Sequence, residues 1–447
     1  MFTKEYLSHH KKTASLAYPL CLSQLGQIMV GVVDTAMVGH LGTIQQAAVA
    51  LANSVFMAIL VFGIGVSYGI TPLVAIADSH KNEKECAHLL KNGLLVNVFT
   101  GIVLFIFLYL ATPLMKNLGE PTHIVSLAIP FFSVLLFSMI PLSFFFSFKQ
   151  FAEGLSRTRI AMLISVAGNI VNIILNYIFI FGKCGMAPMG IMGSCWASFI
   201  SRVFMAIGMF LYVFYDAYFK PYWKNFFSDE ASFSMPLIRK ILGIGIPTGF
   251  QFVFEVATFA IAAIMTGWIG AVPLAAHQIA LSIAAITYMV ASGLGAAACV
   301  RIGNQFGLKS KKNMHQVGFS AYFMVICFML CSAILLILLR NILPIIFTND
   351  PKVIAVSSSL LVIAAFFQLS DGIQVVGLGL LRGMKDVKIP TLITFIAYWA
   401  IGLPCSYVLA FKFGLGVQGV WYGLLLGLTA SAGLLFLRFR HVLKSIE

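Results

Sequence analysis

The sequence predicts an all-α membrane protein with twelve transmembrane helices arranged as two lobes of six helices. Three observations predict this fold class: the apolar composition, the recurrence of runs long enough to cross a bilayer, and an internal repeat. Of 447 residues, 60% are hydrophobic and only 10% are charged, whereas roughly a quarter of a soluble protein is charged. Such a chain cannot hide its apolar surface from water, so we expect its solvent to be lipid.

Apolar runs of about 20 residues, the length that crosses the hydrocarbon core as a helix, recur along the whole chain. Charged clusters and Gly or Pro signals separate them. We place the helices at residues 14–38, 47–74, 93–115, 124–147, 160–181, 190–214, 241–269, 275–300, 316–339, 353–380, 389–411 and 417–437. The polar opening leads into a long apolar run, so we expect an anchoring first span and no cleaved signal peptide.

Lysine and arginine residues gather on alternate sides of the predicted spans. The N-terminus, every second loop and the C-terminal tail hold 23 of them, the opposite loops hold 5, and Arg202 lies inside a span. Because loops rich in Lys and Arg stay in the cytoplasm, we expect both termini there. The net charge of +14 follows membrane topology, so we expect no nucleic-acid partner.

The two halves of the chain resemble each other. The shift that places Pro19 on Pro247 also places Gly39 on Gly267. Each half has an even number of helices, so the halves are expected to be parallel repeats that face each other across a cleft, as alternating access requires. We expect an N-terminal lobe at 1–215, a cytoplasmic linker at 216–240 and a C-terminal lobe at 241–447.

Three acidic residues lie within predicted spans: Asp34, Glu255 and Asp371. A charge at the centre of a membrane helix costs about 2.5 to 3.5 kcal/mol, so each carboxylate needs a cavity, a partner or a bound cation. Polar neighbours that could line a substrate or ion cleft are Gln251, Gln368, Gln374, Asn172, Asn176 and Gln27. Spacings of three and four residues put several of these on helix faces adjoining the carboxylates.

A carboxylate in a poor dielectric can take up a proton near neutral pH, or it can hold Na⁺ when enough oxygens surround it. We therefore expect Glu255, Asp371 and Asp34 to bind a coupling cation, with Glu255 and Asp371 as candidate Na⁺ ligands. Interhelical hydrogen bonds without a transport role remain an alternative. Most phenylalanines of the fourth helix, between Phe131 and Phe148, are expected to face lipid.

Several function classes are disfavoured. The eight cysteines are scattered, and we find no CxxC pair or Cys/His cluster, so we assign them no metal or disulfide role. An intramembrane enzyme would need a paired nucleophile and base or a metal-ligand cluster, and the sequence suggests neither; we expect no enzyme and no cofactor. A flippase for lipid-linked precursors would be expected to carry basic residues in its cavity, but only Arg202 lies in a span.

Specific motifs resemble the multidrug and toxic compound extrusion (MATE) family. The segment from Pro19 to Gly42, with Val33-Asp34-Thr35, is similar to the family's first helix. Gln251-Phe-Val-Phe-Glu255 and Pro273-Leu-Ala-Ala-His277-Gln278 resemble its seventh and eighth helices, and Gln368-Leu-Ser-Asp371-Gly-Ile-Gln374 with Arg382-Gly383 resembles its tenth. The resemblance covers nearly the whole chain and is strongest to the norfloxacin-exporter branch.

The resemblance implies two six-helix lobes that export organic cations and drugs against inward Na⁺ or H⁺. It implies a cation site at Glu255 and Asp371 and an N-terminal carboxylate at Asp34. Where another branch of the family carries a second N-terminal Asp, this chain has Asn176, which modestly favours Na⁺ over a proton mechanism at Asp34. We further expect a monomer in contact with membrane lipid, spanning the bacterial inner membrane several times.

Overall fold

The computed structural model describes residues 4–117, 121–227 and 233–446, and all regular secondary structure in these ranges is helical. Twelve helical segments in them are long and apolar enough to cross a membrane, so the predicted fold class is confirmed. The helices of the first half are α1 (Lys4–Gly39), α2 (Thr43–Ser67), α3 (Ile70–Ser79), α4 (Glu83–Ala111), η1 (Thr112–Asn117), α5 (Thr122–Phe137), α6 (Met139–Gly154), α7 (Thr158–Phe181) and α8 (Ile191–Tyr215).

The second half repeats this plan after a short connection. The connection holds η2 (Ala217–Phe219) and α9 (Lys220–Phe226), and the helices of the second half are α10 (Met235–Ile269), α11 (Ala271–Gly307), α12 (Lys311–Leu339), η3 (Leu343–Ile346), α13 (Pro351–Gly383), α14 (Lys388–Phe395), η4 (Ile396–Gly402), α15 (Leu403–Tyr407), η5 (Val408–Lys412) and α16 (Gly416–Ser445). Each predicted span overlaps one of the twelve apolar segments, and several of these segments, among them Thr43–Ser79, Thr122–Gly154 and Lys388–Lys412, consist of more than one helix. Part of the predicted linker, residues 228–232, lies outside the described residues.

The chain divides into two compact units. The N-terminal unit is Leu22–Gly249, and the C-terminal unit is Phe250–Glu447 together with Met1–Cys21. Both divisions fall inside a helix, α1 and α10, and in each case a proline, Pro19 or Pro247, lies shortly before the division. Because Pro19 and Pro247 are aligned by the sequence repeat, the two divisions fall at corresponding positions of the two halves.

The internal repeat is also seen in the backbone dihedral angles. Lys81 and Lys309 have left-handed φ values of 53° and 52°, and Ser156 and Lys385 have φ values of 62° and 63°. Such values are uncommon outside glycine, so their occurrence at corresponding turns of the two halves is a specific likeness. The predicted internal repeat is confirmed by these matching turns.

Close helix crossings also recur at corresponding positions. A Cβ on Gly65 of α2 would lie 2.4 Å from the Cα of Gly249 in the N-terminal unit. In the C-terminal unit a Cβ on Gly293 of α11 would lie 2.6 Å from the Cα of Cys21. Glycine is needed at Gly65 and Gly293 because the backbones approach too closely for any side chain.

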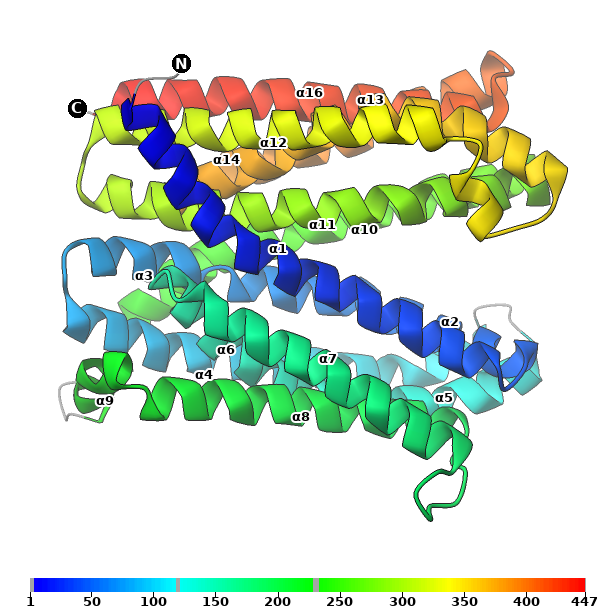
Figure 1. Cartoon of the computed structure of the whole chain (residues 1–447), viewed down its shortest axis with the longest axis horizontal. Helices are drawn as coiled ribbons and strands as arrows, with labels where there is room; N and C mark the ends of the chain where they lie inside the picture. The colour runs from blue at the N-terminus through cyan, green and yellow to red at the C-terminus, as the bar shows by residue number, and fades with distance from the viewer. Residues whose placement is uncertain (1–3, 118–120, 228–232, 447) are drawn as a thin grey trace. The chain divides into compact units, whose positions relative to one another are not determined.

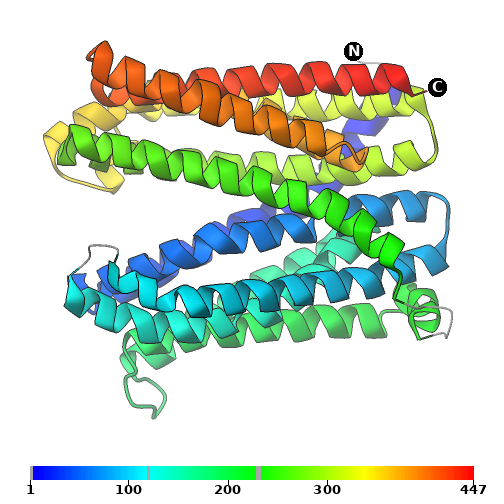
Figure 2. The ribbon, with the colours of Figure 1, turned by 180° about the vertical axis from the view of Figure 1, so that it is seen from behind.

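Within the N-terminal unit α7 packs along α8, and α6 packs against both α4 and α8 (Figure 1). Within the C-terminal unit α13 is the central helix, since it contacts α11, α12 and α16. The segment from α14 to η5 lies beside α16, as Figure 2 shows from behind. A core of buried side chains around Trp421, Leu360 and Tyr398 holds these helices together.

The eleventh span departs from regular α-helix. Ile396–Gly402 and Val408–Lys412 are π-helical, and the short α15 lies between them. Pro404 in α15 lacks the backbone N–H that an α-helical turn would use, which accounts for irregular hydrogen bonding nearby. π-Helical turns occur frequently at functional sites, and this one places the Tyr398 ring in the interior.

The expectation that the fourth-span phenylalanines mostly face lipid is wrong. Five of the seven are buried: Phe131, Phe132, Phe145, Phe146 and Phe148. The short helix α9 supplies an aromatic partner, because the Phe148 and Trp223 ring centroids are 6.4 Å apart. Hydropathy alone cannot separate a lipid-facing ring from one that packs between helices, since both environments are apolar.

Candidate functional site

Two carboxylates are buried in the C-terminal unit. Glu255 of α10 is 7% exposed and Asp371 of α13 is 5% exposed. The charge of Glu255 acts on the Asp371 carboxyl, which places the two groups in one electrostatic environment. Because α13 is buried on most of its circumference, its aspartate has little access to water.

The hydrogen bonding of the pair is incomplete. The Tyr288 hydroxyl of α11 is hydrogen-bonded to Glu255. No hydrogen bond to the Asp371 carboxylate is found among the residues that the structure describes. A buried carboxylate with no donor, close to a second carboxylate, is costly unless a proton or another cation neutralises it.

Two glutamines lie one helical turn from the carboxylates, and each donates to a hydroxyl group of the eleventh span. Gln374 Nε2 donates to the Tyr398 hydroxyl at 2.6 Å, and Gln251 Nε2 donates to Thr391 Oγ1 at 3.0 Å. The Oε1 atoms of both glutamines are buried and have no hydrogen-bond partner among the described residues. Amides held by their nitrogens in this way leave their oxygens available to a cation, so this donor set fits Na⁺ as well as a proton.

The hydrogen bonding of Gln368 differs from that of Gln251 and Gln374. Its Oε1 accepts a hydrogen bond from Ser332 Oγ at 2.9 Å, and its Nε2 is buried with no partner in the part of the chain that the structure describes. Its oxygen is therefore engaged by α12. Of the three glutamines singled out in the C-terminal half of the sequence, Gln251 and Gln374 offer an acceptor, whereas Gln368 offers a donor.

The N-terminal unit holds a second polar cluster around Asp34 of α1. Asn176 Nδ2 donates to Asp34 Oδ1, and Ser198 Oγ donates to Asp34 Oδ2 at 3.4 Å. Asn172 joins the cluster, because its Oδ1 accepts from Asn176 at 3.0 Å and its Nδ2 donates to Ser198 at 3.3 Å. The candidate Gln27 is exposed on α1.

Arg202 of α8 adds a positive charge to this cluster. It lies one turn after Ser198, and its charge acts on the Asp34 carboxyl. The guanidinium donates to the Ser138 hydroxyl and lies 5.0 Å from the centroid of the Phe56 ring. Asp34 thus has hydrogen-bond donors and a nearby cation, and these favour its ionised form and oppose the cost of burying the charge.

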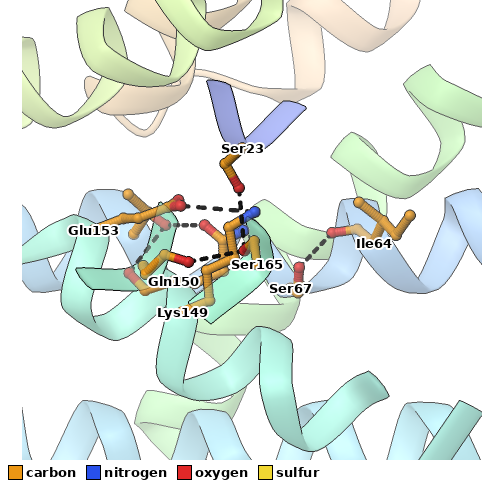
Figure 3. A network of polar contacts seen from close by, with 9 residues as sticks. Ser23, Ile64, Ser67, Lys149, Gln150, Glu153 and Ser165 are labelled. Atoms are coloured by element: carbon orange, nitrogen blue, oxygen red, sulfur yellow. Dashed lines mark hydrogen bonds and ion pairs between the residues drawn. The ribbon is translucent and has the colours of Figure 1, made fainter. Parts of the chain in front are cut away.

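Sequence reasoning missed a buried ion pair on α6. Lys149 Nζ lies 3.8 Å from Glu153 Oε1, and both side chains are 4% exposed. Figure 3 shows this pair beside Gln150, whose Oε1 accepts from Thr71 at 2.6 Å. The predicted span ended at residue 147, which placed both charges in a loop, whereas α6 continues to Gly154.

Tyr288 and Tyr398 were also missed as neighbours of the C-terminal carboxylates. Tyrosines of membrane helices concentrate at the two interfaces, but these two lie near the centres of the predicted spans 275–300 and 389–411. A mid-span tyrosine was therefore a usable signal, although the sequence gives no means of telling which carboxylate it would meet.

Comparison with known proteins agrees with this architecture. The MatE family model matches residues 19–178 and 247–408, so its two matched segments begin at Pro19 and Pro247, the prolines that the repeat aligns. The chain is 31% identical over 446 residues to the multidrug resistance protein MdtK of Pectobacterium atrosepticum, in a match that covers 98% of this chain and 97% of that relative.

Solved structures share the fold at lower identity. A MATE transporter in a straight conformation matches with a TM-score of 0.90 and 20% identity, covering 98% of this chain and 97% of the other. The eukaryotic MATE transporter AtDTX14 matches with a TM-score of 0.88 and 20% identity, covering 99% and 100%. A MOP superfamily transporter from Pyrococcus furiosus, described as having a binding pocket of reverse polarity that suggests a different function, also matches with a TM-score of 0.88 at 20% identity over 98% and 96%.

These structural matches establish the fold, and the sequence matches establish more. The family model covers well over half of the chain, and the bacterial relative matches it almost from end to end. The chain therefore belongs to the MatE family of transporters.

Proposed function

We propose that this protein exports small organic cations and drugs in exchange for Na⁺ or H⁺ entering the cell. Family membership supports a transporter, and the relative with 31% identity is named a multidrug resistance protein. The coupling cation binds at Glu255 and Asp371 in the C-terminal unit. Gln251, Gln374 and Tyr398 supply the neighbouring oxygens.

One observation carries this assignment. Asp371 is 5% exposed, lies under the influence of the Glu255 charge, and has no hydrogen-bond donor among the described residues. Placing two ionised carboxylates in a poor dielectric is unfavourable, and binding one cation relieves both the repulsion and the desolvation. The site therefore has a strong preference for being neutralised.

Cation entry and drug export are coupled if the cation and the exported compound bind preferentially to different conformations of the protein. A ligand shifts an equilibrium between two conformations only through its difference in affinity for them. Cation entry from outside stabilises the state in which Glu255 and Asp371 are neutralised, and the exported compound binds that state less well. Each substrate then promotes release of the other.

The flippase alternative is not favoured. The comparisons identify transporters of the MatE family, but the Pyrococcus furiosus relative with a pocket of reverse polarity illustrates that fold alone does not identify cargo. The charge of the site must decide, and the C-terminal cluster holds two carboxylates, Glu255 and Asp371, with the charge of one arginine, Arg382, acting on Glu255. An anionic lipid-linked precursor would be repelled by it, whereas an organic cation would be attracted.

We propose the same topology as the charge distribution predicts, with both termini in the cytoplasm. The twelve apolar segments and the bacterial relative support a multi-pass protein of the inner membrane. In this topology the basic ends of the helices face the cytoplasm.

The test is efflux of a fluorescent cationic dye from proteoliposomes under an imposed Na⁺ gradient or an imposed H⁺ gradient. Export driven by one gradient is expected in the wild type and is expected to be lost in Glu255→Gln and Asp371→Asn. Glu83→Gln, which removes a carboxylate from the first turn of α4, is the matched control and should export normally. Dye movement that ignores both gradients in folded protein would contradict the antiporter.

A further inference from the structure

A groove of about 1030 Å³ lies between α12 and α16 of the C-terminal unit, with residues of α13 at its base. It involves neither Glu255 nor Asp371. The Tyr322 ring forms part of one wall and meets the rings of Phe436 and Phe439 edge-on, at centroid distances of 5.4 and 5.9 Å. These ring contacts join α12 to α16 and hold the two walls of the groove together.

The lining residues follow helical spacing. On α12 they repeat every four residues along one face: Lys311, His315, Phe319, Phe323 and Cys327. On α16 they include Gly433, Phe436, Arg440 and Lys444. Residues four apart lie on adjoining parts of a helix surface, so each set forms a stripe that winds slowly around its helix along the groove.

The groove is divided into a basic end and an apolar end. Lys311 begins α12 and Lys444 lies in the last turn of α16, and both are exposed. Lys311 Nζ donates to the backbone carbonyls of Lys444 and Ile446 at 3.3 and 2.8 Å. This contact fixes the positive charge at the end of the groove and leaves the ammonium group a third N–H to donate.

The apolar end has the depth of one membrane leaflet. From Phe319 to Leu330 the lining of α12 rises by about 16 Å, at about 1.5 Å per residue, which is close to half of the roughly 30 Å hydrocarbon core. At the far end the Ser370 and Thr429 hydroxyls bond to each other at 2.9 Å. A chain lying along the groove from its basic end would thus reach about the middle of the bilayer.

From these observations we infer that the groove binds an anionic phospholipid of the membrane. Its phosphate lies between Lys311, Arg440 and Lys444, and an acyl chain lies along Phe319, Phe323 and Gly433. Basic pockets between transmembrane helices are suited to such head groups. The groove opens to the cytoplasmic leaflet in the proposed topology. Only this assignment of the leaflet rests on that proposal.

Charge complementarity selects this occupant over an exported organic cation. Among the described residues that line the groove, none is acidic, whereas Lys311, Arg440 and Lys444 are basic. A second groove, of about 910 Å³ in the N-terminal unit, is lined only by apolar residues such as Phe137, Phe144 and Trp196. A lipid there would show no preference for a head group.

The experiment is native mass spectrometry of the full-length detergent-purified protein with phosphatidylglycerol or phosphatidylcholine of identical acyl chains. The wild type is expected to retain phosphatidylglycerol preferentially. The double variant Arg440→Gln and Lys444→Gln should bind phosphatidylglycerol roughly thirtyfold more weakly, from the loss of two cationic groups at a membrane surface. The matched control, Arg340→Gln with Lys352→Gln, removes two exposed basic residues after the end of α12 and at the start of α13 and should retain the lipid.

A steric variant tests the apolar end with the charges left intact. A Cβ on Gly433 would meet open space, and so would one on Gly243 of α10, which does not line the groove. Gly433→Leu is expected to reduce phosphatidylglycerol retention at least severalfold by filling the groove, and Gly243→Leu should have no effect. Because both leucines enter open space, neither variant should disturb folding, and a thermal unfolding scan checks this.

Several results would overturn the inference. Equal retention of the two lipids by the wild type, equal loss in both double variants, or displacement of the lipid by the cationic dye would each do so. Lipid retention is measured without any ion gradient. Failure of the antiporter proposal would therefore leave this result standing, and failure of the lipid site would leave dye export unaffected.

Discussion

Asp34 and Asp371 are both aspartates inside a membrane-spanning helix, yet their surroundings differ in charge and in hydrogen bonding. Asp34 is partly exposed, accepts from Asn176 and Ser198, and has Arg202 nearby. Asp371 is buried, has no hydrogen-bond donor among the described residues, and lies near a second carboxylate. A carboxylate in a membrane helix is therefore not by itself a coupling site, because its neighbours decide whether it needs a cation.

The largest expected effect concerns cation affinity. Asp371→Asn should weaken binding of the coupling cation by at least about 100-fold, because one of two interacting carboxylates is removed from a poorly screened site. Asp34→Asn should change it by less than about threefold, since Asn176, Ser198 and the Arg202 charge already interact favourably with that carboxylate. Isothermal titration of the purified variants with the ion identified in liposomes measures both. Equal losses in the two variants would mean that the units share one function.

The second prediction concerns a variant that gives the N-terminal cluster two carboxylates, as in the C-terminal cluster. Asn176→Asp places a second carboxylate beside Asp34, so ionising both becomes unfavourable. The variant is expected to lose about 2 kcal/mol of stability between pH 5 and pH 8 relative to wild type. Denaturation at the two pH values measures this, with Asn169→Asp, two helical turns away, as the control. A pH-independent effect would contradict the electrostatic explanation.

A smaller effect is expected at the π-helical turn. Tyr398→Phe leaves Gln374 Nε2 without its acceptor, which should cost about 1 to 3 kcal/mol of stability and free the amide to rotate. Cation affinity should fall by roughly threefold to tenfold. Tyr407→Phe alters an exposed tyrosine of the same span and should change neither quantity. Unchanged affinity in Tyr398→Phe would remove this residue from the site.

The smallest effect is expected at Ser198. Its hydrogen bond to Asp34 is 3.4 Å long, and Asn176 remains as a second donor after Ser198→Ala. Stability should fall by about 0.5 to 1.5 kcal/mol, and cation affinity by less than about twofold. The same titration and denaturation experiments apply. A tenfold loss of affinity would show that the N-terminal cluster binds the coupling ion as well.

The sequence predicted the fold class and helix count well because the bilayer imposes a length and a polarity on every span. The spans from 14–38 to 417–437 each fall on a helix of the structure. Helix ends were less accurate, as α6 shows: Lys149 and Glu153 pair one turn apart and are buried, so the helix continues past the point where hydropathy falls. A hydropathy scale penalises each charge separately, whereas two opposite charges can be buried together as an ion pair.

The candidate site was only partly accessible to sequence reasoning. Asp34, Glu255 and Asp371 stand out because charge is rare in membrane helices. Their neighbours from other helices, Arg202 and Tyr398, could not be assigned to them. Residues far apart in the chain meet only through helix packing, and a spacing rule reaches no further than one helix.

Four properties of the protein are specified by its sequence alone: the membrane solvent, the number of spans, the repeat that aligns the two halves and the three acidic positions. All of these follow from composition and periodicity, which are properties of the chain before it folds. Helix packing, in contrast, places the Arg202 charge where it acts on Asp34 and the Glu255 charge where it acts on Asp371. It also decided that basic residues of α12 and α16 meet at the end of an apolar groove, because electrostatic environment depends on distances between helices, and packing alone sets these.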